Sequence, residues 1–147
     1  MTLQLRVRPY RLPLRRPWRS ARGVRQVRQG WLLALSAGDG SVGYGDCAPL
    51  PEAGTEDQAT GRRALLAWQR LHGDALRTAI EAAGADAHPT PALVYGLQCA
   101  LADLHARQVG QPLAAYLGEA PAPAIPVNAT LGAVASVRPD ELTTLAE

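Results

Sequence analysis

The 147-residue sequence contains no lysine, and all 15 of its basic residues are arginine. Lysine is one of the few side chains that enzymes use as a general acid or base, so acid–base catalysis by a lysine lies outside this chain. Cysteine is scarce as well, because Cys47 and Cys99 are too few for a disulfide framework. We expect both to be buried free thiols in a reducing cytoplasm.

Long apolar runs are also missing. No stretch is apolar enough to cross a bilayer, and no apolar segment follows the basic N-terminus as a secretory signal would require. The sequence therefore predicts a cytoplasmic domain without a membrane partner. Its 47% hydrophobic residues and mean hydropathy of -0.09 are typical of a folded chain with a core.

Acidic residues are absent before Asp39, whereas nine of the 15 arginines lie between Arg6 and Arg28. Such asymmetry can mark a surface that binds nucleic acid or another anion. The arginines are interleaved with valine, leucine and tryptophan at strand spacing, which favours a solvated β surface instead. We therefore expect no nucleic-acid partner. An arginine-rich nucleic-acid-binding module stays as an alternative, which salt-sensitive binding to random DNA or RNA would support.

The first third of the chain has the pattern of β structure. The segment Leu3–Val7 alternates apolar and polar residues, as a half-buried strand does. Three prolines then recur at every fourth position and disfavour a central ladder. Residues 12–23 are accordingly predicted to form a loop.

Two further strands are predicted, at Val24–Ser36 and Ser41–Ala48, joined by the hairpin signal Gly38–Gly40. The last of them runs into the stretch Val42–Pro51, where two glycines flank Tyr44. Glycines there indicate a close approach of the backbone to another element, or an unusual backbone angle. The first 48 residues thus predict a three-stranded antiparallel meander.

Helical patterns follow the meander. Thr55 and Gln58 have the spacing of a capping box, which would open a helix running to about Leu71. A shorter helix is predicted for Asp74–Ala83. We expect a helical bundle after the sheet, and hence an α+β fold.

The most regular helical pattern begins at Thr90-Pro91, a typical cap and first-turn pair. Its apolar residues recur at helical spacing, and the pattern ends at Gly110. One or two more turns are predicted for Gln111–Leu117. The expected apolar stripe consists of Leu93, Leu97, Ala100, Leu101 and Leu104.

The composition changes near the end of the chain. Ala120–Ala124 reads as a linker, Ile125–Leu131 as a new strand and Pro139–Glu147 as the start of a helix. A single strand–helix unit cannot bury itself or make a sheet. The sequence therefore predicts one domain over residues 1–119 and, over residues 120–147, the beginning of a second domain that is missing.

Three stretches carry a resemblance to a known family: Gly43–Pro51, Tyr95–Leu104 and Ile125–Ala129. Together they resemble the N-terminal capping domain of the enolase superfamily, of the mandelate racemase/muconate lactonizing type, and most closely the o-succinylbenzoate synthase family of menaquinone synthesis. Two departures are visible. Asp46 stands where the family more often has glutamate, and Glu52-Ala53-Gly54 replaces the usual glycine–aromatic–small turn.

The resemblance implies a lyase that abstracts a proton next to a carboxylate, with Mg²⁺ stabilising the enediolate and lysines as acid and base. In that family these groups sit at the ends of barrel strands. By this resemblance, residues 120–147 are the first unit of a barrel and residues 1–119 its cap. We expect no catalytic and no metal-binding residue in this chain, which alone would be inactive. Its partners would be its own C-terminal barrel domain and a small carboxylate substrate.

The cap of such an enzyme closes over the barrel mouth, and the resemblance implies two loops that do so here. The expected substrate-binding residues are Arg19, Ser20, Ala21, Arg22, Gly23, Leu50 and Pro51. Either Arg19 or Arg22 could meet a substrate carboxylate, and both could equally be ordinary surface arginines. A glycine at position 23 suits a hinged loop.

Other motifs in the sequence give weaker indications of function. Gly43–Ala48 has the letters of a dinucleotide fingerprint, but prolines follow where that motif opens a helix. The histidines have no metal-ligand spacing, and Cys47 has no clear base beside it. We expect structural roles for Asp46 and Asp103, in holding loop amides or in holding the helix against the meander.

Alternatives within the superfamily stay open. The cap could belong to a dipeptide epimerase, an N-acylamino acid racemase or a muconate cycloisomerase, which the missing barrel strands would discriminate. A cap without its barrel should also expose apolar surface, so we expect self-association, with homo-oligomers detectable by light scattering.

Overall fold

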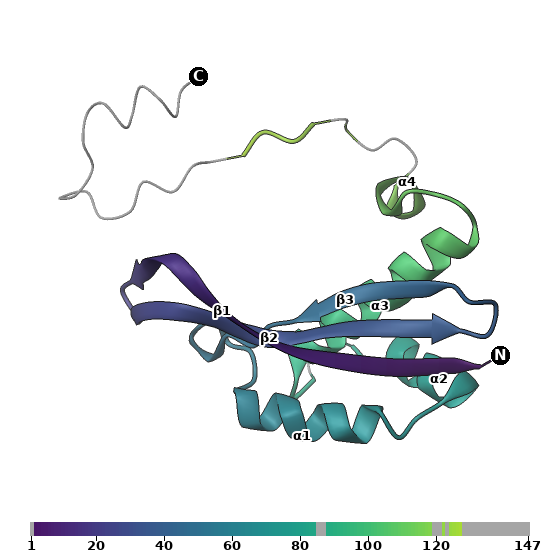
Figure 1. The fold of residues 1–147 in the computed structure, drawn as a ribbon, viewed down its shortest axis with the longest axis horizontal. Helices are drawn as coiled ribbons and strands as arrows, with labels where there is room; N and C mark the ends of the chain where they lie inside the picture. The colour runs from purple at the N-terminus through teal and green to yellow at the C-terminus, as the bar shows by residue number, and fades with distance from the viewer. Residues whose placement is uncertain (1, 85–87, 119–121, 123, 128–147) are drawn as a thin grey trace.

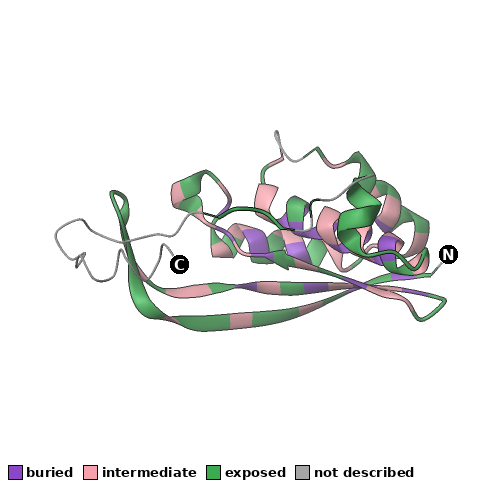
Figure 2. Cartoon of the chain, turned by 90° about the horizontal axis from the view of Figure 1, so that it is seen from above, coloured by how far each residue is buried: buried purple, intermediate pink, exposed green. Residues whose placement is uncertain are grey.

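The computed structural model describes residues 2–84, 88–118, 122 and 124–127 of the chain. Its three strands form one antiparallel sheet in the order β1-β2-β3, and helices α1, α2 and α3 lie on one face of it (Figure 1, Figure 2). This arrangement confirms the predicted α+β fold with a three-stranded meander. The elements are β1 (Leu3–Ser20), β2 (Gly23–Ala37), β3 (Val42–Cys47), the 3-10 helix η1 (Pro51–Ala53), α1 (Gln58–Trp68), α2 (Gly73–Ala82), α3 (Pro91–Gln108) and α4 (Leu113–Leu117).

Strand β1 is much longer than the sequence pattern indicated. The predicted loop over residues 12–23 is wrong, because β1 continues to Ser20 and only Ala21 and Arg22 form the turn into β2. The prolines are tolerated because β1 is an edge strand, in which alternate backbone positions face solvent and need no donor. A register shift between Pro13 and Trp18 interrupts the pairing.

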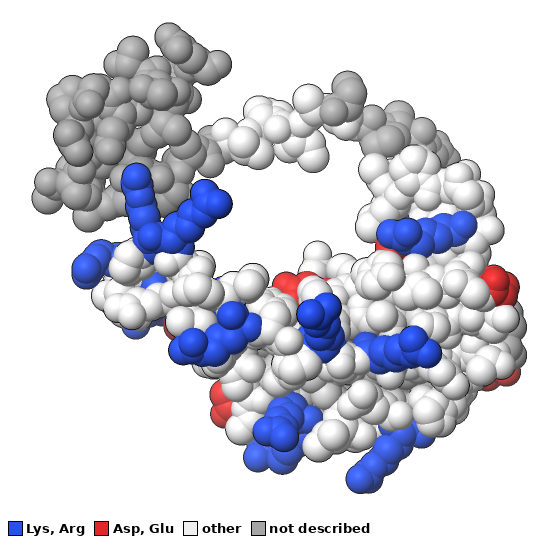
Figure 3. Space-filling view, in the orientation of Figure 1, with Lys and Arg blue, Asp and Glu red and all other residues white. Residues whose placement is uncertain are grey.

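The distal part of the β1–β2 hairpin, residues 10–29, projects beyond the helices, and we call it the hairpin arm (Figure 1). None of its residues is buried. Arginine side chains are spread over the sheet and the arm on the face that Figure 3 shows, with few acidic ones among them. The arm is therefore held by strand pairing and by side-chain links, without a core of its own.

The core lies between the sheet and the helices. The predicted stripe of α3 is buried in full, which confirms the pattern read from the sequence. Side chains of alternate β1 and β2 residues meet it from the sheet, as the period of a strand requires. The central residues are Leu3, Leu5, Leu33, Leu35, Leu65, Leu76, Ile80, Leu93, Leu97, Ala100, Leu101 and Leu104.

Helix α3 packs directly on the backbone of β3. A Cβ added to Gly43 would overlap the Ala100 carbonyl oxygen, and one added to Gly45 would overlap the Gly96 carbonyl oxygen. From the helix side, a Cβ on Gly96 would lie 2.7 Å from the Asp46 carbonyl oxygen. The glycines beside Tyr44 therefore do mark a close approach, as the sequence predicted.

The edge of β3 is bonded to the same helix. Asp103 accepts a hydrogen bond from the Tyr44 backbone N–H at 2.9 Å and another from Arg107 Nε at 2.9 Å. The Arg107 guanidinium also lies over the Tyr44 ring. Asp103 thus holds α3 against the meander, the structural role expected for it.

The capping box predicted at Thr55 and Gln58 is wrong. Helix α1 begins two residues later, with Asp57 as its cap accepting from the Thr60 N–H at 2.7 Å. Thr55 instead accepts from the Leu50 N–H, and the Gln58 amide donates to the Gln29 carbonyl. Both side chains are drawn into tertiary contacts, which local spacing does not reveal.

Helix α3 is capped from a distance. Thr90 precedes it and Pro91 fills its first turn as predicted, but the Thr90 side chain makes no capping bond. The buried carboxylate of Glu56 accepts from the Ala92 N–H at 3.0 Å and from the Leu93 N–H at 2.9 Å. A negative charge at the start of a helix is favourable, and here it also joins α3 to the segment before α1.

The C-terminal predictions are only partly tested. Gly110 has a left-handed backbone after α3, and α4 ends before Gly118, both as expected. The predicted strand from Ile125 is not formed in its described part, because Ile125–Val127 are exposed and irregular. The linker, the remainder of that strand and the helix predicted for Pro139–Glu147 lie wholly or largely outside the described residues. Among the described helices, none has the length and apolarity that a membrane span needs.

Candidate functional site

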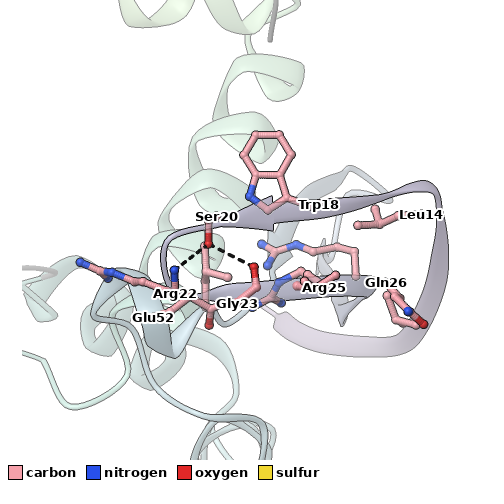
Figure 4. Close-up of a pocket in the computed structure, with 12 residues that line it drawn as sticks. Leu14, Trp18, Ser20, Arg22, Gly23, Arg25, Gln26 and Glu52 are labelled. Carbon is pink, nitrogen blue, oxygen red and sulfur yellow. Dashed lines mark hydrogen bonds and ion pairs between the residues drawn. The ribbon is translucent and has the colours of Figure 1, made fainter. Parts of the chain in front are cut away.

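The two segments predicted to cap a substrate lie together. A hollow of about 710 Å³ opens between the tip of the hairpin arm and the turn after β3 (Figure 4). Of the predicted residues, Ser20, Arg22, Gly23 and Leu50 line it, whereas Arg19, Ala21 and Pro51 do not. The other lining residues, which the sequence reasoning did not single out for this site, are Leu14, Trp18, Val24, Arg25, Gln26, Val27, Arg28 and Glu52.

The tip of the arm is a tight turn held by one hydroxyl. Ser20 Oγ accepts from the Arg22 N–H at 3.2 Å and donates to the Gly23 carbonyl at 3.5 Å. Gly23 has φ of 135°, which other residues rarely adopt, so a glycine is required for the turn itself. This geometry places Arg22 at the hollow without any contact from the core.

The opposite wall is the segment of residues 50–55, which we call the turn segment. The Leu50 N–H donates to Thr55 Oγ1 at 2.6 Å, and the Ala53 N–H donates to the Leu50 carbonyl at 2.8 Å. Gly54 closes the turn in a left-handed conformation. Leu50 is therefore fixed at both of its backbone groups, and it lines the hollow.

Two arginines of β2 bind the chain that follows β3. Arg25 forms an ion pair with Glu52, and Arg28 donates to the Ala48 carbonyl at 2.6 Å and to the Pro49 carbonyl at 3.4 Å. The hydrogen bond from Arg25 lowers the pKa of the Glu52 carboxyl below its ordinary value. Among the described residues, Arg22 makes no close ion pair with a carboxylate, although its charge also acts on Glu52, so it is the lining guanidinium most open to another anion.

One of these links had a visible signal in the sequence. Glu52 stood out as a departure from the usual turn of the resembled family, and its partner explains why a carboxylate suits that position. Arg25 and Arg28 had no such signal, because they are two of the nine arginines in a segment, Arg6–Arg28, that contains no acidic residue. Only the pairing of β1 with β2 brings them to the turn segment.

The chemistry-bearing residues elsewhere are engaged in the fold. His88 contacts Thr90, and His105 contacts Arg77 and Tyr116, so the two lie in separate interactions. Burial raises the pKa of the Cys47 thiol to about 12, which keeps it protonated and unreactive. In the described part of the chain, no three metal-binding side chains come together.

Asp46 also has a structural partner. The Tyr10 hydroxyl donates to its carboxylate at 2.9 Å and 3.2 Å, and a Cβ on Gly30 would lie 2.8 Å from that hydroxyl. Burial, followed by the Asp46 carboxylate, raises the pKa of Tyr10 to about 12. The pair braces the base of the hairpin arm. The stretch Gly43–Ala48 lies mostly in β3, and no helix opens at its glycines, so it is not a dinucleotide fingerprint.

Solved structures share this architecture. A mandelate racemase/muconate lactonizing protein from Herpetosiphon aurantiacus matches with a TM-score of 0.67 and 27% identity, over 80% of this chain and 34% of that one. A dipeptide epimerase from Methylococcus capsulatus matches with a TM-score of 0.66 and 28% identity, over 80% of this chain and 35% of that one. The fold is that of an enolase-superfamily N-terminal cap.

The sequence narrows the family further. Residues 4–104 match the family described as MenC, N-terminal domain, and the chain belongs to that family. It is 47% identical over 49 residues to the o-succinylbenzoate synthase of Thermosynechococcus vestitus, and 34% identical over 79 residues to that of Photorhabdus laumondii. These matches cover 33% and 54% of this chain, but only 15% and 22% of the two relatives. Domains of this family are normally paired with a C-terminal barrel domain.

Proposed function

We propose that this chain is the N-terminal substrate-capping domain of an o-succinylbenzoate synthase-like enzyme of menaquinone synthesis, acting in the cytoplasm. The observation that supports it is the hollow that the hairpin tip and the turn segment form together, in a chain of the MenC N-terminal family. Closing this hollow over the mouth of a barrel would exclude water from the reaction. Water exclusion strengthens the electrostatic stabilisation of an enolate.

Arg22 is our candidate for the contact with the substrate. It lines the hollow and has no carboxylate partner in the described part of the chain, whereas Arg25 is neutralised by Glu52. Apolar side chains of Leu14, Trp18 and Leu50 surround the space beside it. A small carboxylate with an apolar body would find both kinds of contact there.

The proton transfers and the metal belong, in this proposal, to the barrel domain. The solved dipeptide epimerase of Methylococcus capsulatus was obtained with Mg and a dipeptide, so the class can work with that ion. The described residues of this chain do not fit such a site, since no three metal-binding side chains converge among them, and the sequence supplies no lysine as acid or base. The chain alone would therefore be catalytically silent.

Two measurements test the proposal. Incubating the 147-residue chain with the cyclohexadiene carboxylate substrate and Mg²⁺ should give no turnover, and turnover above background would contradict it. Reading the gene downstream of codon 147 should reveal a barrel whose strands carry paired lysines and then acids. A frame without them, combined with no barrel protein co-purifying with the chain, would overturn the assignment.

In the protein expressed with its barrel, Arg22→Ala should raise KM about tenfold or more, because a charge-assisted hydrogen bond to the substrate is lost. Arg19→Ala is the matched control. It changes a nearby arginine at the end of β1 that does not line the hollow, so its KM should stay close to the parent value. Equal effects of the two variants would count against the assigned role of Arg22.

A dipeptide epimerase cap is the second candidate. The match to the Methylococcus capsulatus epimerase extends over 80% of this chain, which supports it as far as the fold is concerned. Epimerisation of a dipeptide by the complete protein, without conversion of the cyclohexadiene carboxylate, would favour this second candidate over the first.

A further inference from the structure

The two walls of the hollow are joined by a single polar link. Within the described chain, the Arg25–Glu52 ion pair is the only hydrogen bond or ion pair between residues 14–26 of the arm and the turn segment. Both side chains are partly exposed, at 25% and 38%, so water and salt reach the pair. The link therefore lies where it can open without disturbing the core.

The neighbouring link is of another kind. Arg28 donates to two backbone carbonyls, those of Ala48 and Pro49, at the point where the chain leaves β3. Backbone carbonyls do not titrate, and Arg28 sits closer to the buried base of the arm. Arg28 thus anchors the chain just before the turn segment, while Arg25 holds Glu52 within the segment by a charged hydrogen bond.

From this geometry we infer that Arg25 and Glu52 form a latch that makes the hairpin tip and the turn segment move as one unit. Its relevance to substrate capping rests on the proposed function, whereas the latch itself rests only on contacts within this chain. Because Arg22 lies in the turn, three residues before Arg25 of β2, the latch sets where the Arg22 guanidinium stands over the hollow. Arg25 and Glu52 are positioning residues, which act through Arg22 and Leu50.

Local hydrogen exchange of the 147-residue chain tests the coupling. Glu52→Gln and Arg25→Gln should each speed exchange about two- to fivefold in both segments, residues 21–26 and 51–54, as loss of one exposed ion pair implies. The double variant should exchange no faster than either single variant, because one interaction is lost in all three. Amides of α3 should be unchanged.

Arg19→Gln is the matched control for this experiment, since it removes an arginine of the arm that has no carboxylate partner among the described residues. Additive effects of Arg25→Gln and Glu52→Gln would overturn the latch. It would also be overturned if each variant affected only its own segment, or if Arg19→Gln reproduced the pattern. No substrate is involved, so a failed latch and a failed capping function are separate results.

A pH titration provides a readout that a merely structural role would not give. Trp18 lies opposite Arg25 in the β1–β2 register, and among the described residues Glu52 is the only acid that lines the hollow. The groups facing Glu52 are the guanidinium groups of Arg22 and Arg25. The Trp18 indole N–H signal in an NMR spectrum should therefore shift as Glu52 is protonated in acid, and the shift should vanish in Glu52→Gln. A signal that titrates equally in both proteins would contradict the latch.

Discussion

The two halves of the β1–β2 hairpin are stabilised by different interactions. Near its open end, Leu3, Leu5, Leu33 and Leu35 are buried under the helices. In the hairpin arm, residues 10–29, no residue is buried, and single side-chain contacts set its position. The same pair of strands is thus a rigid platform at one end and an adjustable arm at the other. A domain that closes over a ligand needs both, because loops that move come from the low-stability part of a fold.

The largest loss of stability should follow from adding a side chain where β3 packs against α3. In Gly45→Ala the new Cβ would overlap the Gly96 carbonyl oxygen, a backbone atom that cannot move alone. We expect a loss of about 3 kcal/mol in the free energy of unfolding, measured by urea denaturation. Gly84→Ala is the control, since its Cβ would meet nothing within 4 Å and should cost nothing. Equal stability of the two variants would remove the basis for the contrast.

The next largest effect concerns the cap of α3. Glu56→Ala leaves the Ala92 and Leu93 N–H groups without their carboxylate, and should cost about 2 kcal/mol of unfolding free energy. Asp57→Ala removes an exposed, local cap of α1 and should cost about 1 kcal/mol. If the local cap proved the more important, Glu56 would not be the joint between the two helices. Chemical denaturation of both variants in parallel decides this.

A smaller effect should appear in alkali. Burial raises the pKa of Cys47 from about 9 in the unfolded chain to about 12, so the stability it contributes is complete below pH 9 and declines as pH rises toward 12. Between pH 8 and pH 10 the unfolding free energy should fall by about 1 kcal/mol. Tyr10 adds the same trend only above pH 10.

The absence of lysine simplifies the interpretation of this pH dependence, because no lysine titrates in the same range. Cys47→Ala should flatten the decline between pH 8 and pH 10, whereas Cys99→Ala should retain it. An unchanged slope in Cys47→Ala would mean that another group is responsible.

The smallest effect belongs to the arm. Arg22→Ala should change the unfolding free energy by no more than about 0.5 kcal/mol, because Arg22 is exposed and does not belong to the core. Thermal unfolding followed by circular dichroism provides the comparison with Gly45→Ala. A large loss of stability would show that the arm is part of the platform after all.

Local patterns predicted the platform well and the arm poorly. The α3 stripe and the glycines beside Tyr44 follow from periodicity and sterics alone, and the structure confirms both. The loop predicted for residues 12–23 was wrong because prolines forbid a central strand but not an edge strand. Which strand is an edge depends on the whole sheet, and no local pattern contains that information.

The same limit applies to the site. Thr55 and Gln58 had the spacing of a capping box, yet Thr55 bonds Leu50 and Gln58 bonds Gln29. In both residues, a hydrogen bond to another part of the fold replaced the predicted local one. Of the seven residues predicted to bind substrate, four line the hollow, and their contact with a substrate stays a prediction. The Arg25–Glu52 pair could not be predicted, because eight other arginines of that basic segment looked equivalent to Arg25.

The bond from the Tyr44 N–H to Asp103 has one more consequence. An outer strand with free amides is a template onto which another polypeptide can add. On one side of this sheet, α3 occupies that position. On the other side, the regularly spaced prolines of β1 offer no donors, and its arginines repel one another. Each margin therefore presents fewer amides to a fourth strand, which works against growth of the sheet into fibrils.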